Sequence, residues 1–201
     1  MELQHVTYSG PPIDDEPLLA RLPTSLADLL RQMNGFIQLH GGLHVRGACL
    51  QPAWHSLREA WAGGSAFHRF YPHVRRKDVP FAEDCMGDQF LLRSGRVYKL
   101  AAETGALEPM NVSLAAFFQA VAADPVEFLS LHPLIKFQHD GGRLEPGQLL
   151  GAFPPFCCKQ SADGVSLAAI PTGERRRFLA DLAAQVRDLP EGAEIEFEIA
   201  D

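Results

Sequence analysis

Apolar residues near the start of the chain recur every three or four positions, which is the spacing of one helix face. A helix is therefore predicted in the stretch LPTSLADLLRQMNGF, with Thr24 or Ser25 as its cap and Asn34-Gly35 as its stop. The same spacing predicts another helix from Met110 to Ala123, capped by Ser113, whose apolar face must pack against a sheet. The residues that form this face are Leu114, Phe117, Phe118 and Val121.

Short apolar runs bounded by turn residues predict strands. Phe90 to Arg93 and Val97 to Leu100 are expected to form a hairpin, because Ser94-Gly95 between them is a two-residue link. The segment from Phe36 to Ala48 is expected to form a strand, a kink at its two adjacent glycines and a second strand. The clearest alternation lies near the end, where Ile195, Phe197 and Ile199 point one way and Glu194, Glu196 and Glu198 the other.

The second half of the chain carries weaker signals. Asp124-Pro125-Val126-Glu127 is a helix start with a capping residue, and His132-Pro133 is expected to close that helix. Residues 137–164 are rich in Gly and Pro, so we expect loops there, with one helical turn at Gln148 to Leu150. Val165 to Ile170 is predicted as a strand, and a helix capped by Thr172 is predicted after it.

The region between the first helix and the hairpin contains two features with simple interpretations. Pro52 is expected to open a helix in which Trp54 and Trp61 pack into the core, with ligand stacking as the alternative. Residues 68–78, HRFYPHVRRKD, are interpreted as a solvated basic loop rather than a phosphate site.

Composition and charge narrow the class of protein. Of the 201 residues, 46% are hydrophobic and 21% are charged, which is typical of a globular protein. The formal net charge of -7 argues against a nucleic-acid-binding surface and permits a basic partner. The chain has no basic-then-apolar leader and no apolar run of about 20 residues. We therefore expect a cytoplasmic protein with reduced cysteines and no contact with a membrane.

Carboxylates gather just before the hairpin. Glu83, Asp84 and Asp88 lie around Gly87, and because carboxylates are seldom buried we expect them to face water or a partner. Their spacing does not match a calcium loop, so no metal or cofactor is assigned. Cys85 is a poor candidate nucleophile, since nearby carboxylates raise the pKa of a thiol. No phosphate loop or serine nucleophile motif is present, and no catalytic residue is assigned.

The motifs described above also support a family resemblance. LPTSLADLLRQMNGF resembles the opening of the SUKH superfamily, which groups fungal cell-wall-synthesis regulators of the Smi/Knr type with many bacterial immunity proteins and the Syd protein. VPFAEDCMGDQFLL is similar to the family pattern of an apolar-Pro-Phe stretch, acidic residues, Gly-Asp and a strand. GRVYKL and SLAAFFQAV follow as its second strand and Phe-rich helix. The resemblance covers residues 22–121, with residues 63–77 as an insertion.

The resemblance implies an α+β fold, in which a mixed, largely antiparallel sheet is packed by helices and serves as a binding scaffold. The expected organisation is a polar lead over residues 1–17, a SUKH-like core over 18–123, and a carboxyl-terminal α+β extension over 124–201 that packs on the core.

The expected function is non-enzymatic binding of a protein partner. Bacterial members of the family commonly neutralise a toxin, so the leading hypothesis is an immunity-type protein that caps a basic toxin or nuclease domain. The expected contact residues are Glu83, Asp84, Asp88, Glu196 and Glu198. One alternative is a regulatory adaptor that binds a housekeeping protein. Another is a small-molecule-binding protein that uses the aromatic residues and the Cys157-Cys158 pair of its carboxyl-terminal half.

Overall fold

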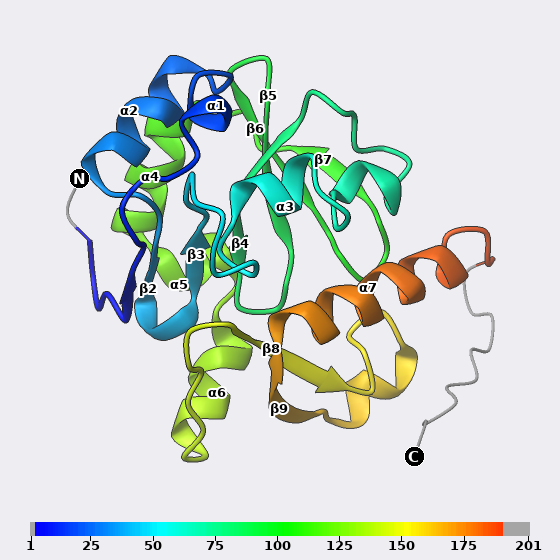
Figure 1. Ribbon diagram of the computed structural model, residues 1–201. Helices are drawn as coiled ribbons and strands as arrows, with labels where there is room; N and C mark the ends of the chain where they lie inside the picture. Colours follow the sequence, from blue (N-terminus) through cyan, green and yellow to red (C-terminus); the bar gives the residue numbers. More distant parts are fainter. Residues whose placement is uncertain (1–2, 191–201) are drawn as a thin grey trace.

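The protein has an α+β fold built on a seven-stranded antiparallel sheet (Figure 1). The computed structural model describes residues 3–190. Strands neighbour each other in the sheet in the same order as in the chain, so short connections suffice between most of them. The strands are β1 (Tyr8–Ser9), β2 (Phe36–Gln38), β3 (Leu43–Val45), β4 (Val79–Asp84), β5 (Gln89–Arg93), β6 (Arg96–Leu100) and β7 (Leu107–Pro109).

Helices and a second, two-stranded sheet complete the fold. The α-helices are α1 (Glu16–Leu19), α2 (Thr24–Gln32), α3 (Leu57–Trp61), α4 (Leu114–Ala123), α5 (Pro125–Leu129), α6 (His132–His139) and α7 (Thr172–Val186). Short 3-10 helices lie at η1 (Leu39–Gly41), η2 (Phe67–Arg69) and η3 (Lys159–Asp163). The second sheet is the antiparallel pair β8 (Gln148–Phe153) and β9 (Ser166–Pro171).

Several local predictions are confirmed. Ser94 and Gly95 join β5 to β6, and both have positive φ angles, of 49° and 80°, as a tight hairpin turn requires. The Ser113 hydroxyl accepts a hydrogen bond from the Ala116 amide at 3.2 Å and caps α4. Helix α2 also lies where it was predicted, but Pro23 precedes it and neither Thr24 nor Ser25 supplies a side-chain cap.

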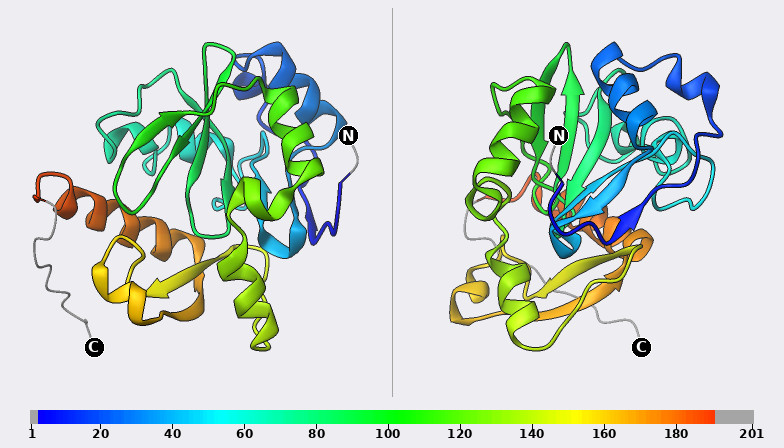
Figure 2. Two further views of the ribbon diagram at one scale, coloured as in Figure 1. Left: turned by 180° about the vertical axis from the view of Figure 1, so that it is seen from behind. Right: turned by 90° about the vertical axis from the view of Figure 1, so that its left-hand side faces the viewer.

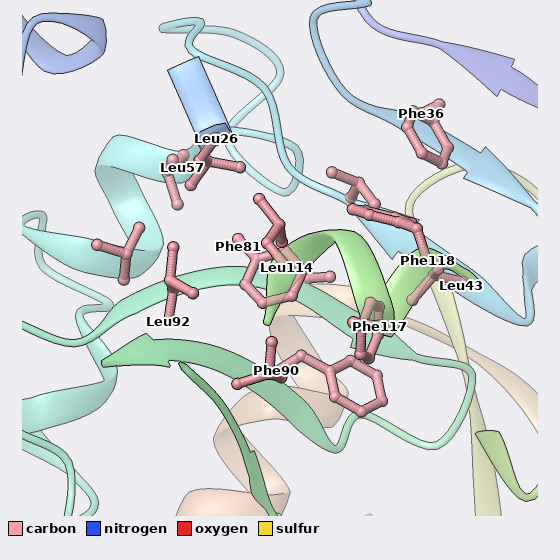
Figure 3. Packing of buried hydrophobic residues seen from close by; sticks show 14 of the residues in the cluster. Leu26, Phe36, Leu43, Leu57, Phe81, Phe90, Leu92, Leu114, Phe117 and Phe118 are labelled. Atoms are coloured by element: carbon pink, nitrogen blue, oxygen red, sulfur yellow. The ribbon is translucent and has the colours of Figure 1, made fainter. Parts of the chain in front are cut away.

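The apolar face of α4 packs on one face of the larger sheet (Figure 3). Phe117 is fully buried, with its ring centroid 4.8 Å from that of Phe90 and 5.5 Å from that of Phe81. Helix α2 adds Leu26 and Leu30 to the same core. Alternation along β5 sends Leu91 to the opposite face, where it packs with the Tyr71 ring and with α7. Both faces of the sheet are therefore covered.

The carboxyl-terminal extension docks on the end of the larger sheet. Figures 1 and 2 show α7 running across this end, with the β8–β9 hairpin on its other side. The Leu150 amide donates to the Cys85 carbonyl at 2.7 Å, and the Leu179 side chain of α7 packs closely against Gly87, which has a φ of 98°. Two predictions here are wrong, because Gln148 to Leu150 forms a strand and His132-Pro133 opens α6.

The polar lead and the second predicted helix also differ from expectation. Residues 1–17 contain β1 and the start of α1, and the Asp15 side chain is buried against Arg58. Helix α3 begins at Leu57, capped by Ser56, so Trp54 lies in the preceding loop. The alternating segment 194–199 lies outside the described residues.

Candidate functional site

The structure places the predicted acidic residues in two different environments. Glu83 and Asp84 end strand β4, with relative exposures of 0% and 2%. They were expected to face water or a partner, and neither faces water. Asp88 lies in the following turn and keeps 23% of its side chain exposed. Glu196 and Glu198 lie outside the described residues. Adjacent residues of a strand point to opposite faces, so the Glu83 and Asp84 side chains enter separate clusters.

Glu83 is the centre of a buried polar network. Its Oε1 atom accepts a hydrogen bond from His44 Nδ1 at 2.9 Å, and its Oε2 atom accepts one from Arg46 Nη2 at 2.9 Å. Gln89 Nε2 donates to Oε2 at 3.1 Å. The guanidinium of Arg176, on helix α7, adds a two-pronged ion pair to both carboxylate oxygens. Nearby positive charges hold the pKa of Glu83 well below its usual range despite its burial.

Two histidines extend this network toward the amino-terminal strands. His44 Nε2 lies 2.8 Å from His55 Nδ1, and His55 Nε2 lies 3.1 Å from the Asn34 carbonyl oxygen. Three contacts link Asn34, His55, His44 and Glu83 in a row, and each contact needs one hydrogen atom. Two neutral imidazole rings carry one N–H each, so the geometry favours uptake of one further proton. Burial opposes that uptake more strongly and lowers the pKa of His44 to about 4 and that of His55 to about 3. Burial therefore favours the neutral form of both rings.

Aromatic residues close the network from outside. The Trp54 ring lies 5.3 Å from the His44 ring and 5.0 Å from the Tyr8 ring, measured between centroids. Trp61 is buried, and its indole N–H donates to the Arg76 carbonyl at 3.0 Å. Trp61 packs in the core, as expected, whereas Trp54 is half-buried and lies outside both hydrophobic clusters.

Asp84 and Asp88 lie beside one lysine at an open cavity. Asp84 Oδ1 accepts hydrogen bonds from the backbone amides of residues 86, 87 and 88 at 2.9, 3.1 and 3.0 Å. Lys99 Nζ lies 3.6 Å from Asp84 Oδ2 and 3.0 Å from Asp88 Oδ2. Burial, followed by the charge of Asp88, raises the pKa of Asp84 to about 8, against the opposing effects of Lys99 and the amides. Two carboxyl groups therefore share one ammonium.

The cavity has a volume of about 420 Å³ and is lined by segments far apart in sequence. Glu103, from the loop after β6, contributes a third carboxylate, which accepts from the Cys157 amide at 2.8 Å. Burial and the Glu103 charge raise the pKa of Cys157 to about 12, so its thiol stays protonated at neutral pH. Apolar wall positions include Met86, Leu129 and Phe156.

Sequence reasoning missed the residues that complete both clusters. Neighbouring arginines of α7 divide between them, since Arg176 binds Glu83 and the Arg175 guanidinium lies 3.5 Å from Glu103. The only sequence signal was the run ERRRF on a predicted helix, which does not identify the partners of its arginines. His44 and His55 carry no motif that joins them to each other.

Comparisons with known proteins do not extend these assignments. No family model, curated protein or solved structure matches the chain. Within residues 3–190, no cluster of His, Cys, Asp and Glu side chains is arranged to hold a metal ion. Over the same residues, no helix is long and apolar enough to cross a membrane.

Proposed function

We propose that the protein is a non-enzymatic binding module that engages a protein partner at the acidic cavity. The observation that supports this proposal is the convergence of Asp84, Asp88 and Glu103 on one open cavity of about 420 Å³. Asp88 and Glu103 replace Glu83 as the contact residues, because they keep 23% and 14% of their side chains exposed whereas Glu83 has no exposed surface.

The charges at this cavity favour a basic side chain from the partner. With the pKa of Asp84 raised to about 8, Lys99 already balances the charge of Asp88 at neutral pH. An incoming guanidinium or ammonium would favour ionisation of the Asp84 carboxyl and pair with it. A basic toxin or nuclease domain presents such groups, and the sequence resemblance implies partners of that kind. We therefore favour toxin neutralisation as the biological role.

The test begins with capture of a partner from the native host by the tagged protein, followed by mass spectrometry. Binding is then compared between the wild type and the variant D88N/E103Q, which removes charge with little change of shape. The control D28N/E108Q changes two exposed acids outside the cavity. We expect a stoichiometric basic domain to bind the wild type and the control, and to bind the cavity variant at least about tenfold more weakly. Equal binding by all three proteins would refute the assigned surface.

Two other outcomes would favour the alternative functions. Capture of a housekeeping protein through the same residues would indicate a regulatory adaptor. The cavity volume also falls in the range of about 300–1,000 Å³ that is usual for small-molecule sites, and its wall combines apolar residues with a few charged groups. Absence of any protein partner, together with a small molecule retained through purification and lost in D88N/E103Q, would favour ligand binding.

A further inference from the structure

The lysines and arginines of this acidic protein are unevenly paired. Of the 18, ten form ion pairs with carboxylates of the described residues. Among the unpaired ones, Arg69, Arg75, Arg76 and Lys77 belong to a single connection, from α3 to β4, and all four are exposed. The chain has excess acid, yet the acids that the structure describes leave this segment without counter-ions.

Arg21 joins the same surface from the turn between α1 and α2. Its guanidinium carbon lies 4.9 Å from the centroid of the Trp61 ring, and the Trp61 indole N–H donates to the Arg76 carbonyl at 3.0 Å. We call Arg21, Arg69, Arg75, Arg76 and Lys77 the basic patch. The remaining unpaired cations of the described chain are Arg96, Lys159 and Arg177.

The backbone of the patch is held in place by neighbouring elements. The Asp78 carboxylate accepts from the Arg75 amide at 2.7 Å and is otherwise engaged by Arg93 of β5, at 2.8 and 2.6 Å. Arg93 also donates to the His73 carbonyl at 2.9 Å. The one acid within residues 68–78 is therefore buried and neutralised, and the cations project from a fixed backbone. A preordered loop loses less conformational entropy when a partner binds.

The local electrostatic field is positive. His68 lies among these cations, and burial together with the charges of Arg76 and Arg69 lowers its pKa. Like charges that crowd without a counter-ion repel one another, and an anionic partner would relieve that repulsion. This favours a binding surface over a solvated loop.

We propose that the basic patch docks a short acidic segment of a protein. This inference goes beyond the proposed function, since it concerns a second surface of opposite charge. Arginine forks match planar carboxylates in a two-pronged geometry. A short segment fits because screening limits the patch field to about 8 Å in physiological salt. A long nucleic-acid duplex would extend beyond the patch, and the remainder of the chain would repel it because the net charge of the whole chain is -7.

The test measures binding of a fluorescein-labelled peptide of ten glutamates to the full chain by fluorescence anisotropy. The patch variant is R75E/R76E/K77E. The matched control is R96E/K159E/R177E, which makes the same change of charge at the three unpaired cations outside the patch. Circular dichroism checks that each variant is folded. We expect the patch variant to bind at least about tenfold more weakly and the control to stay within about twofold of the wild type.

Three results would overturn the proposal. These are absence of peptide binding by the wild type at low salt, an equal loss in both variants, and tighter patch-dependent binding of a DNA duplex than of the peptide at matched salt. The last result would assign the patch to nucleic acid. The cavity residues Asp88 and Glu103 are unchanged in both variants, so the outcome is independent of the proposed function.

Discussion

Replacing Arg176 with Met tests whether the Glu83 network fastens helix α7 to the sheet. Methionine keeps most of the apolar length of the side chain and removes its charge. The Glu83 side chain, which is 0% exposed, then loses a two-pronged partner and keeps Arg46, His44 and Gln89. The matched control is R177M on the same helix, because Arg177 is exposed and forms no ion pair within the described residues.

The expected size of the effect follows from the burial of the pair. Breaking a buried ion pair by removing one partner costs about 3–5 kcal/mol. Arg176 is 15% exposed and Arg46 still neutralises Glu83, so we expect the free energy of unfolding to fall by about 2–4 kcal/mol. For a chain of this size, that loss corresponds to a decrease in Tm of roughly 4–16 °C.

Urea unfolding and calorimetry would measure the global effect, and hydrogen exchange would locate it. Exchange should rise more in α7, β8 and β9 than in α4, since Arg176 links the extension to β4. A double-mutant cycle with E83Q isolates the pairwise coupling energy, which we expect at about 1–3 kcal/mol. A decrease in stability no larger than that of R177M, or exchange unchanged in α7, would refute the argument that this ion pair holds the extension.

Two pH dependences and two substitutions test other parts of the structure. His44 and His55, with pKa values lowered to about 4 and 3, take up protons more readily when unfolded, so stability should fall as pH drops from about 6.5 to 4; urea midpoints would show no such fall if the rings were charged in the fold. Asp84, with its pKa raised from 3.8 to about 8, binds a proton more readily when folded, so its contribution to stability should decrease as pH rises from about 4 to 8; above about pH 6.5, where the histidines no longer contribute, D84N should abolish the decrease. F117A should lower the free energy of unfolding by about 3–5 kcal/mol in denaturant titrations, because it opens a cavity among the rings of the core, and a loss below about 1 kcal/mol would contradict the packing. S113A should cost about 1 kcal/mol by the same measurement through loss of the α4 cap, whereas an unchanged midpoint would show that the cap contributes nothing.

Local patterning was enough to predict several elements. The apolar spacing in α2 and α4 and the Ser94-Gly95 link of the β5–β6 hairpin involve residues within a few positions of each other. The Asp124 cap of α5 is equally local, since its carboxylate accepts from the Glu127 amide at 3.3 Å. Interactions between residues this close in sequence can be predicted without knowledge of the tertiary contacts.

Elements that depend on distant pairing were predicted poorly. Residues 148–150 have too few positions to separate a helical turn from a strand, and pairing with β9 makes them a strand. Pro133 was expected to end a helix. Proline is also common in the first turn of a helix, and Pro133 lies in the first turn of α6.

The sequence indicated only part of the candidate site. Sequence spacing was enough to show that carboxylates gather before the hairpin, and the expectation that they are accessible holds for Asp88, with 23% of its side chain exposed. The burial of Glu83 could not be read from the sequence, because the cost of burying a carboxylate depends on its partners, and Arg176 lies 93 positions away. Likewise, the extension completes the wall of the acidic cavity, because it folds back onto the sheet and brings the Cys157 amide within 2.8 Å of the Glu103 carboxylate. Charge placement in this protein is therefore set by contacts between segments that sequence spacing cannot relate.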